Sequence, residues 1–216
     1  MRAIRLVLLS GLSLAAFIGK LQGAPEVDFG FGSVTNASNY TPSAESRHEE
    51  GPGLLPADRA YVRAGTNQFA FLIPAGLKLE TWSDGRVALV SRDYSRQIIF
   101  RLAGPPEPDG AELDSEAWSQ KVMAQHPKAN LVRTFSAFAD SRRGPAYEIA
   151  FVESAGAVRR GLVAFIPSRV AMLEFSLICS PENFEAARQQ FNTVMLTFRS
   201  SDPKGELHIS PLSDKL

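Results

Sequence analysis

The sequence predicts an α+β fold in which a largely antiparallel β-sheet is flanked by two helices. Through most of residues 66–200, short apolar runs alternate with turn residues, which is typical of antiparallel strands joined by hairpins. Near residues 113–126 and 181–197 the apolar spacing changes from two residues to three or four, as amphipathic helices require. These two patterns together define the fold class.

Residues 1–24 are predicted to be a signal peptide. Arg2 and Arg5 precede an uncharged apolar run, which is the arrangement of the positive and hydrophobic regions in exported proteins. This run is shorter than the roughly 20 residues that cross a bilayer as a helix. We therefore expect cleavage, at the bond between Gly23 and Ala24, and a periplasmic or secreted, extracytoplasmic protein. The alternative is an uncleaved signal that anchors the chain in a membrane.

Three further segments follow the signal peptide. Residues 25–65 are dense in Gly, Pro, Ser, Asn and charged residues, a composition that predicts a disordered spacer. Residues 66–200 form the predicted α+β domain. Residues 201–216 are predicted to be a polar C-terminal tail.

The domain is expected to open with strands. Residues 68–73 (QFAFLI) form an apolar run that Pro74-Ala75-Gly76 ends with a turn, and strands are predicted over 86–91 and 97–102. A helix then follows, with Asp114 as its N-cap.

The second half is predicted to be a series of antiparallel strands over residues 131–138, 147–152, 158–166 and 170–178. In the last strand, alternate apolar residues share a face with Cys179, so we expect this cysteine, the only one in the chain, to be a buried core thiol. A single cysteine also excludes an intramolecular disulfide.

The last helix has clear start signals. Ser180 is the expected N-cap, Pro181 the first helical residue, and Glu182 favours the positive end of the helix dipole. One apolar stripe, expected to pack on the sheet, then follows at helical spacing: Phe184, Ala187, Phe191 and Val194.

The order of these elements resembles the Mog1/PsbP-like α/β/α sandwich. The resemblance covers about residues 66–200 and rests on the strand and Pro-Xaa-Gly turn of residues 71–76, the helix that carries Trp118, the antiparallel strands of 147–178 and the helix that begins at Ser180-Pro181-Glu182. It implies a protein without enzymatic activity, as most members of that fold are. It transfers no functional residue, because no shared functional motif is present.

Composition excludes several functions. Removal of Arg2, Arg5 and Lys20 with the signal peptide lowers the 23 basic side chains to 20 against 23 acidic ones, a formal charge of −3. This is not the basic excess that nucleic-acid binding needs. The three histidines, at positions 48, 126 and 208, form no metal-binding or catalytic spacing, so we predict no catalytic residues, no metal and no cofactor.

One surface suggests a partner. Arg142 and Arg143 precede a predicted hairpin and Arg159 and Arg160 begin its returning strand, so we expect all four to meet at one sheet edge. Such a cluster suits an anionic lipid, a polysaccharide or an acidic protein. The alternative is that the arginines only protect exposed strand ends from pairing.

The sequence therefore predicts an exported, non-enzymatic binding or interaction module of unknown partner. An enzyme with an unrecognised site is one alternative, and a membrane-tethered envelope component is the other.

Overall fold

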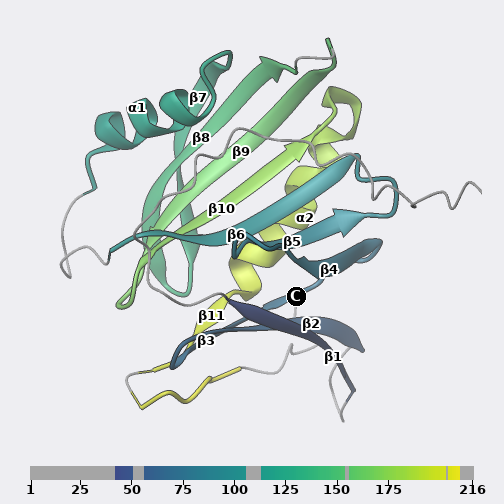
Figure 1. Ribbon diagram of the computed structural model, residues 1–216, viewed down its shortest axis with the longest axis vertical. Helices are drawn as coiled ribbons and strands as arrows, with labels where there is room; N and C mark the ends of the chain where they lie inside the picture. The colour runs from purple at the N-terminus through teal and green to yellow at the C-terminus, as the bar shows by residue number, and fades with distance from the viewer. Residues whose placement is uncertain (1–41, 51–55, 106–112, 154–155, 203, 210–216) are drawn as a thin grey trace, which may run out of the picture.

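The computed structural model describes residues 42–50, 56–105, 113–153, 156–202 and 204–209. Its main layer is a seven-stranded sheet in the order β4-β5-β6-β10-β9-β8-β7, in which all neighbours are antiparallel (Figure 1). The strands are β4 (Leu77–Thr81), β5 (Val87–Ser91), β6 (Arg96–Gly104), β7 (Asn130–Ala139), β8 (Arg142–Val152), β9 (Val158–Pro167) and β10 (Met172–Cys179). The predicted signal peptide lies outside the described residues.

A second sheet contains four strands in the order β1-β2-β3-β11. They are β1 (Ser43–Glu49), β2 (Ala57–Ala64), β3 (Asn67–Leu72) and β11 (Arg199–Ser200). Strand β3 is central, because it pairs with β2 on one side and with β11 on the other. The two ends of the folded chain therefore meet in one sheet.

The spacer predicted over residues 25–65 is wrong where β1 and β2 form. Ala60 and Val62 of β2 are at most 1% exposed and belong to the main core. The signal was weak because two of the three inward residues of β2 are alanines, which are depleted in strands, and because charged residues separate them. Residues 25–41 and 51–55 lie outside the described part of the chain.

Both predicted helices are present. Helix α1 (Ser115–Gln125) begins at Asp114, whose side chain accepts hydrogen bonds from the backbone N–H groups of Glu116 and Ala117. Helix α2 (Phe184–Thr197) follows a short 3₁₀ turn, η1 (Pro181–Asn183), so Ser180 precedes this turn and not the α-helix itself. The predicted apolar stripe of α2 is buried, as expected.

The helices lie on opposite faces of the seven-stranded sheet. One cluster joins the apolar residues of α2, the four-stranded sheet and one face of the main sheet, and a separate cluster lies under α1. In Figure 1, α2 lies behind β10, and α1 lies beside β7 and β8. Five phenylalanines meet between the two sheets, with neighbouring ring centres 5.0–6.3 Å apart: Phe69, Phe71, Phe100, Phe175 and Phe198.

Cys179 is fully buried in this core, as predicted. Burial raises the pKa of its thiol to about 11, which favours the protonated thiol at neutral pH. Gly144 allows β8 to approach β9 closely, since a Cβ there would lie 1.7 Å from the carbonyl oxygen of Phe165.

Candidate functional site

The four arginines expected to form one patch lie at opposite ends of the sheet. Arg142 begins β8, whereas Arg160 pairs with Ala150 near the other end of that strand. At about 3.3 Å per residue, the eight steps along β8 from Arg142 to Ala150 span roughly 26 Å. The expected single patch is therefore wrong, because β9 runs back along β8 and its first residues face the last residues of β8.

The two arginines at the start of β9 are engaged within the protein. Arg159 pairs with Glu153 at 3.0 Å. Arg160 pairs with the buried carboxylate of Glu148, and its guanidinium lies 3.9 Å from the centre of the Phe184 ring. Glu148 also accepts a hydrogen bond of 2.8 Å from Arg133 of β7. These contacts hold the end of the sheet and α2 together.

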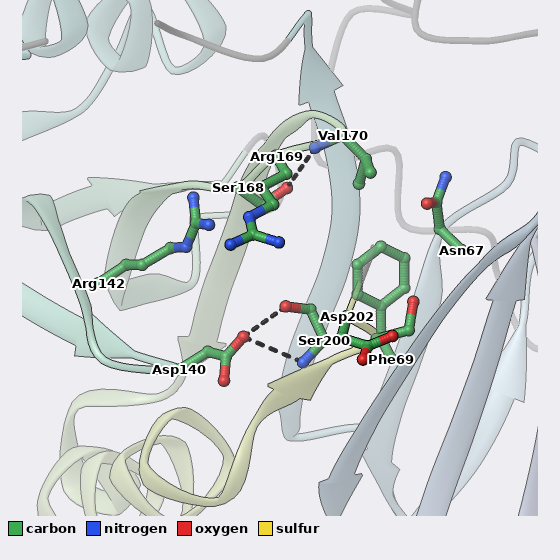
Figure 2. A pocket seen from close by; sticks show the side chains of 10 residues that line it. Asn67, Phe69, Asp140, Arg142, Ser168, Arg169, Val170, Ser200 and Asp202 are labelled. Atoms are coloured by element: carbon green, nitrogen blue, oxygen red, sulfur yellow. Dashed lines mark hydrogen bonds between the residues drawn. The ribbon is translucent and has the colours of Figure 1, made fainter. Parts of the chain in front are cut away.

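Arg142 lines a cavity of about 250 Å³ where the two sheets meet (Figure 2). The walls come from the β7–β8 turn, the β9–β10 turn and the strands β3 and β11. Figure 2 shows its polar and apolar lining residues: Asn67, Phe69, Asp140, Arg142, Ser168, Arg169, Val170, Ser200, Ser201 and Asp202.

Local backbone geometry positions Arg142. Asp140 and Ser141 both have left-handed backbone angles, with φ of 50° and 60°, which reverse the chain between β7 and β8. Asp140 is fixed by β11, because its carboxylate accepts hydrogen bonds from the backbone N–H of Ser200, at 3.1 Å, and from the Ser200 hydroxyl. The Arg142 guanidinium donates to the carbonyl oxygen of Pro167 at 3.3 Å.

The β9–β10 turn presents Arg169 to the same cavity. The hydroxyl of Ser168 donates to the carbonyl oxygen of Ala171 at 2.7 Å and accepts from the backbone N–H groups of Val170 and Ala171. Ser168 is buried, so this turn is well fixed. Arg169 is exposed and, within the described part of the chain, has no hydrogen-bond or ion-pair partner.

The two carboxylates of the cavity are already engaged. Asp140 is bound to Ser200, as described above. Asp202 accepts from the backbone N–H groups of Glu206 and Lys204, each at 2.8 Å, and these bonds, with that of Glu206 the strongest, lower the pKa of its carboxyl group. The charged side chains of the cavity with donors left over are therefore Arg142 and Arg169. Such a pair of guanidinium groups suits one carboxylate or phosphate.

The serine hydroxyls of the cavity already have hydrogen-bond partners. Of its three serines, Ser168 and Ser200 donate to a carbonyl and to a carboxylate, and Ser201 accepts from the backbone N–H of Gln68. No histidine is among its lining residues. A serine nucleophile needs an adjacent general base to activate it. Among the described lining residues, no serine is paired with a histidine.

Arg143 lies in a different cavity, and a group of possible metal ligands lies near the C-terminal end of the described chain. Arg143 lines a cavity of about 450 Å³ beside the start of α1, where it donates to the Ser136 hydroxyl at 2.9 Å. Asp202, Glu206 and His208 bring one ligating atom each within 4.8 Å of one another. Sequence spacing alone missed this group, because the turn from Asp202 to Gly205 creates it.

Arg169 is the residue of the cavity that the sequence analysis did not select. The sequence did contain a signal for both arginines, because each is next to an apolar strand: Arg142 follows a polar turn, and Arg169 lies within one. Their proximity could not be predicted without knowing that β8 pairs with β9. This pairing places the start of β8, with Arg142, beside the end of β9, which Arg169 follows.

Comparison with known proteins reveals similarity in the fold only. No protein-family model and no curated protein sequence matches the chain. The solved structure of LpqN from Mycobacterium tuberculosis, which is involved in cell envelope biogenesis, is similar with a TM-score of 0.50 and 12% identity, over 74% of this chain and 92% of LpqN. The fold is a Mog1/PsbP-like sandwich.

The sandwich is also similar to cyanobacterial PsbP (CyanoP) from Synechocystis sp. PCC 6803, with a TM-score of 0.41 and 14% identity, over 83% of this chain and 96% of that protein. At these identities, similarity says nothing of the partner. Among the described helices of the sandwich, neither has the length and apolar character needed to cross a membrane.

Proposed function

We propose that this protein is an exported interaction module that holds an acidic group of its partner between Arg142 and Arg169. The observation that carries the proposal is the pair of arginines on two fixed turns, in a cavity whose own carboxylates are already hydrogen-bonded. A guanidinium group binds a carboxylate with two parallel hydrogen bonds. Two guanidinium groups therefore form a specific binding site for one acidic group.

The shape of the cavity favours an acidic polymer over a lipid surface. A hollow of about 250 Å³ admits one side chain or one sugar unit. A bilayer surface is broad and attracts clusters of projecting basic residues, whereas the predicted basic patch is divided between distant parts of this sheet. We therefore expect carboxylates of an acidic protein segment or of an acidic polysaccharide to bind.

Binding to polyglutamate and to polygalacturonate tests this proposal. Replacing Arg142 and Arg169 with glutamine removes both guanidinium groups and should weaken binding at least tenfold, because hydrogen bonds to charged groups contribute about 1.5–3 kcal/mol each. The melting temperature should change little, since Arg169 is exposed. Titration by biolayer interferometry at two salt concentrations measures the affinity.

The matched control is the double variant Arg143→Gln with Arg188→Gln, which removes the same charge from an exposed and a half-buried position outside the cavity. This control should keep most of the affinity. An equal loss in both double variants would show that only net charge matters and would contradict a role for the cavity. Binding of polyglutamate alone would identify an acidic protein as the partner.

A further inference from the structure

Strand β7 is an edge of the seven-stranded sheet that lacks the usual protection against pairing. It pairs with β8 on one side, and no described strand pairs with its other side. A bulge between Leu131 and Arg133 interrupts its start, but the residues from Arg133 to Ala139 pair with β8 without irregularity. This stretch contains no proline and no charge after Arg133. Edges that stay unpaired are normally blunted by charges, prolines, bulges or a very short length.

The other edge strands of the described chain have such protection. Strand β4, at the opposite edge of the same sheet, has five residues and carries Lys78 and Glu80. In the four-stranded sheet, β11 has only two residues, and β1 carries acidic and basic side chains at alternate positions: Glu45, Arg47 and Glu49. The open side of β7 differs from all three and is suited to pairing with another strand.

One large apolar side chain of β7 lies outside the core. Phe138 is 56% exposed. Alternate residues of a strand share a face, so Phe138 lies on the same face as Thr134 and Ser136, whereas Phe135 and Ala137 pack into the main core on the other face. A single exposed phenylalanine is ordinary. This one, however, adjoins an open strand edge and a cavity.

That cavity is the hollow of about 450 Å³ beside the start of α1, which we call the Arg143 cavity. Thr134 and Ser136 of β7 line it, together with Leu113 and Arg143. These two residues of β7 share their face with Phe138, so the exposed ring and the hollow lie on the same side of the sheet. A hollow of this volume has room for an aromatic side chain. The edge of β7 therefore presents both a projecting ring and a place for one.

We propose that β7 pairs antiparallel with β7 of a second copy, about a two-fold axis at Ser136, and that Phe138 of each copy enters the Arg143 cavity of the other. This register sets Thr134 opposite Phe138 of the second copy, and Phe135 opposite its Ala137, so a large side chain meets a smaller one on each face. Like charges are not opposed, because Arg133 faces an alanine. The contact is self-complementary and closes at two copies.

Sedimentation velocity of the purified protein over a range of concentrations tests the pairing. The wild type should form a dimer. Phe138→Lys should raise the dimer dissociation constant by at least about tenfold, because its ammonium group would enter the second copy's cavity beside Arg143. Val158→Lys is the matched control and should leave the constant nearly unchanged, since Val158 is 54% exposed but belongs to β9, an inner strand.

Three results of this experiment would contradict the proposal. A wild type that stays monomeric up to millimolar concentration would overturn it, and so would an equal loss of dimer in both lysine variants. Assemblies larger than a dimer would show that β7 pairs with a different edge, and would also reject the two-fold contact.

A cysteine at the proposed axis tests the register. Cys179 is fully buried, so Ser136→Cys introduces the only accessible thiol. Directly opposed residues of antiparallel strands have Cα atoms roughly 4.5–5.5 Å apart, which a disulfide can bridge. Ser136→Cys should therefore form a covalent dimer under mild oxidation, whereas Ser83→Cys, at an exposed position of the β4–β5 turn, should not. Equal rates of crosslinking in both variants would reject pairing at β7. If Phe138→Lys does not fold, the two cysteine variants decide alone.

Discussion

His126 links the stability of the fold to pH. Its backbone N–H closes the end of α1 through the carbonyl oxygen of Val122, and its ring lies 5.5 Å from the centre of the Phe151 ring. The side chain is buried, with 5% exposed. Burial, and after it the positive charge of Arg101, lowers the pKa of His126 to about 4.

Acid should therefore destabilise the protein through this residue. Between pH 6.5 and pH 4 the unfolded chain binds a proton at His126 and the folded protein does not, so the free energy of unfolding falls as the pH falls through this range. We expect a loss of about 2 kcal/mol between pH 7 and pH 5. His126→Phe should remove this part of the dependence in urea unfolding curves, and the exposed His208→Gln should retain it. Parallel pH profiles for His126→Phe and the wild type would contradict the prediction.

Strand β2 is part of the core although its sequence resembles a spacer. Its register with β3 places Val62 opposite Phe69, and both residues are 1% exposed. Arg59 of the same strand is also buried, because it pairs with Glu49 of β1 at 2.9 Å. The β1–β2 hairpin is thus held by apolar packing and by a partly buried ion pair.

Truncation of one side chain tests whether β2 contributes to stability. Val62→Ala should lower the free energy of unfolding by about 2 kcal/mol, since deletion of buried methyl groups also leaves a cavity. Val132→Ala, at a position 52% exposed on the edge strand β7, is the matched control and should change it by less than about 0.5 kcal/mol. If both variants change the free energy of unfolding by equally small amounts in chemical denaturation, β2 does not contribute to stability and behaves as a spacer.

The elements with strong local signals could be predicted from the sequence, and those fixed by distant contacts could not. The N-cap at Asp114 and the stripe of α2 depend on neighbouring residues, and both are confirmed. Strand β4 is five residues long and was missed because only two apolar residues, Leu77 and Leu79, alternate in so short a run. The prediction of a single arginine patch was wrong for another reason. Whether these arginines lie close together depends on which strand ends face each other.

Export is a property of the whole molecule and remains a prediction. The charges of Arg2 and Arg5 before a short apolar run predict removal of the first residues by signal peptidase. The protein isolated from its own host should have an intact mass that starts at Ala24, and it should be found in the periplasmic or secreted fraction. A chain that retains Met1 and sediments with membranes would instead support the anchored alternative.

The pairing of β3 determines when the sandwich can be completed. Strand β3 is synthesised well before its neighbour β11, and the bond from the Gln68 N–H to the Ser201 hydroxyl joins residues 133 positions apart. Closing so long a loop is slow, because chain entropy is lost before any contact compensates for it. A nascent chain therefore exposes one edge of β3 until β11 has been synthesised. A protein built in this way stays incompletely folded while it is being made, which is the state that a translocation channel accepts.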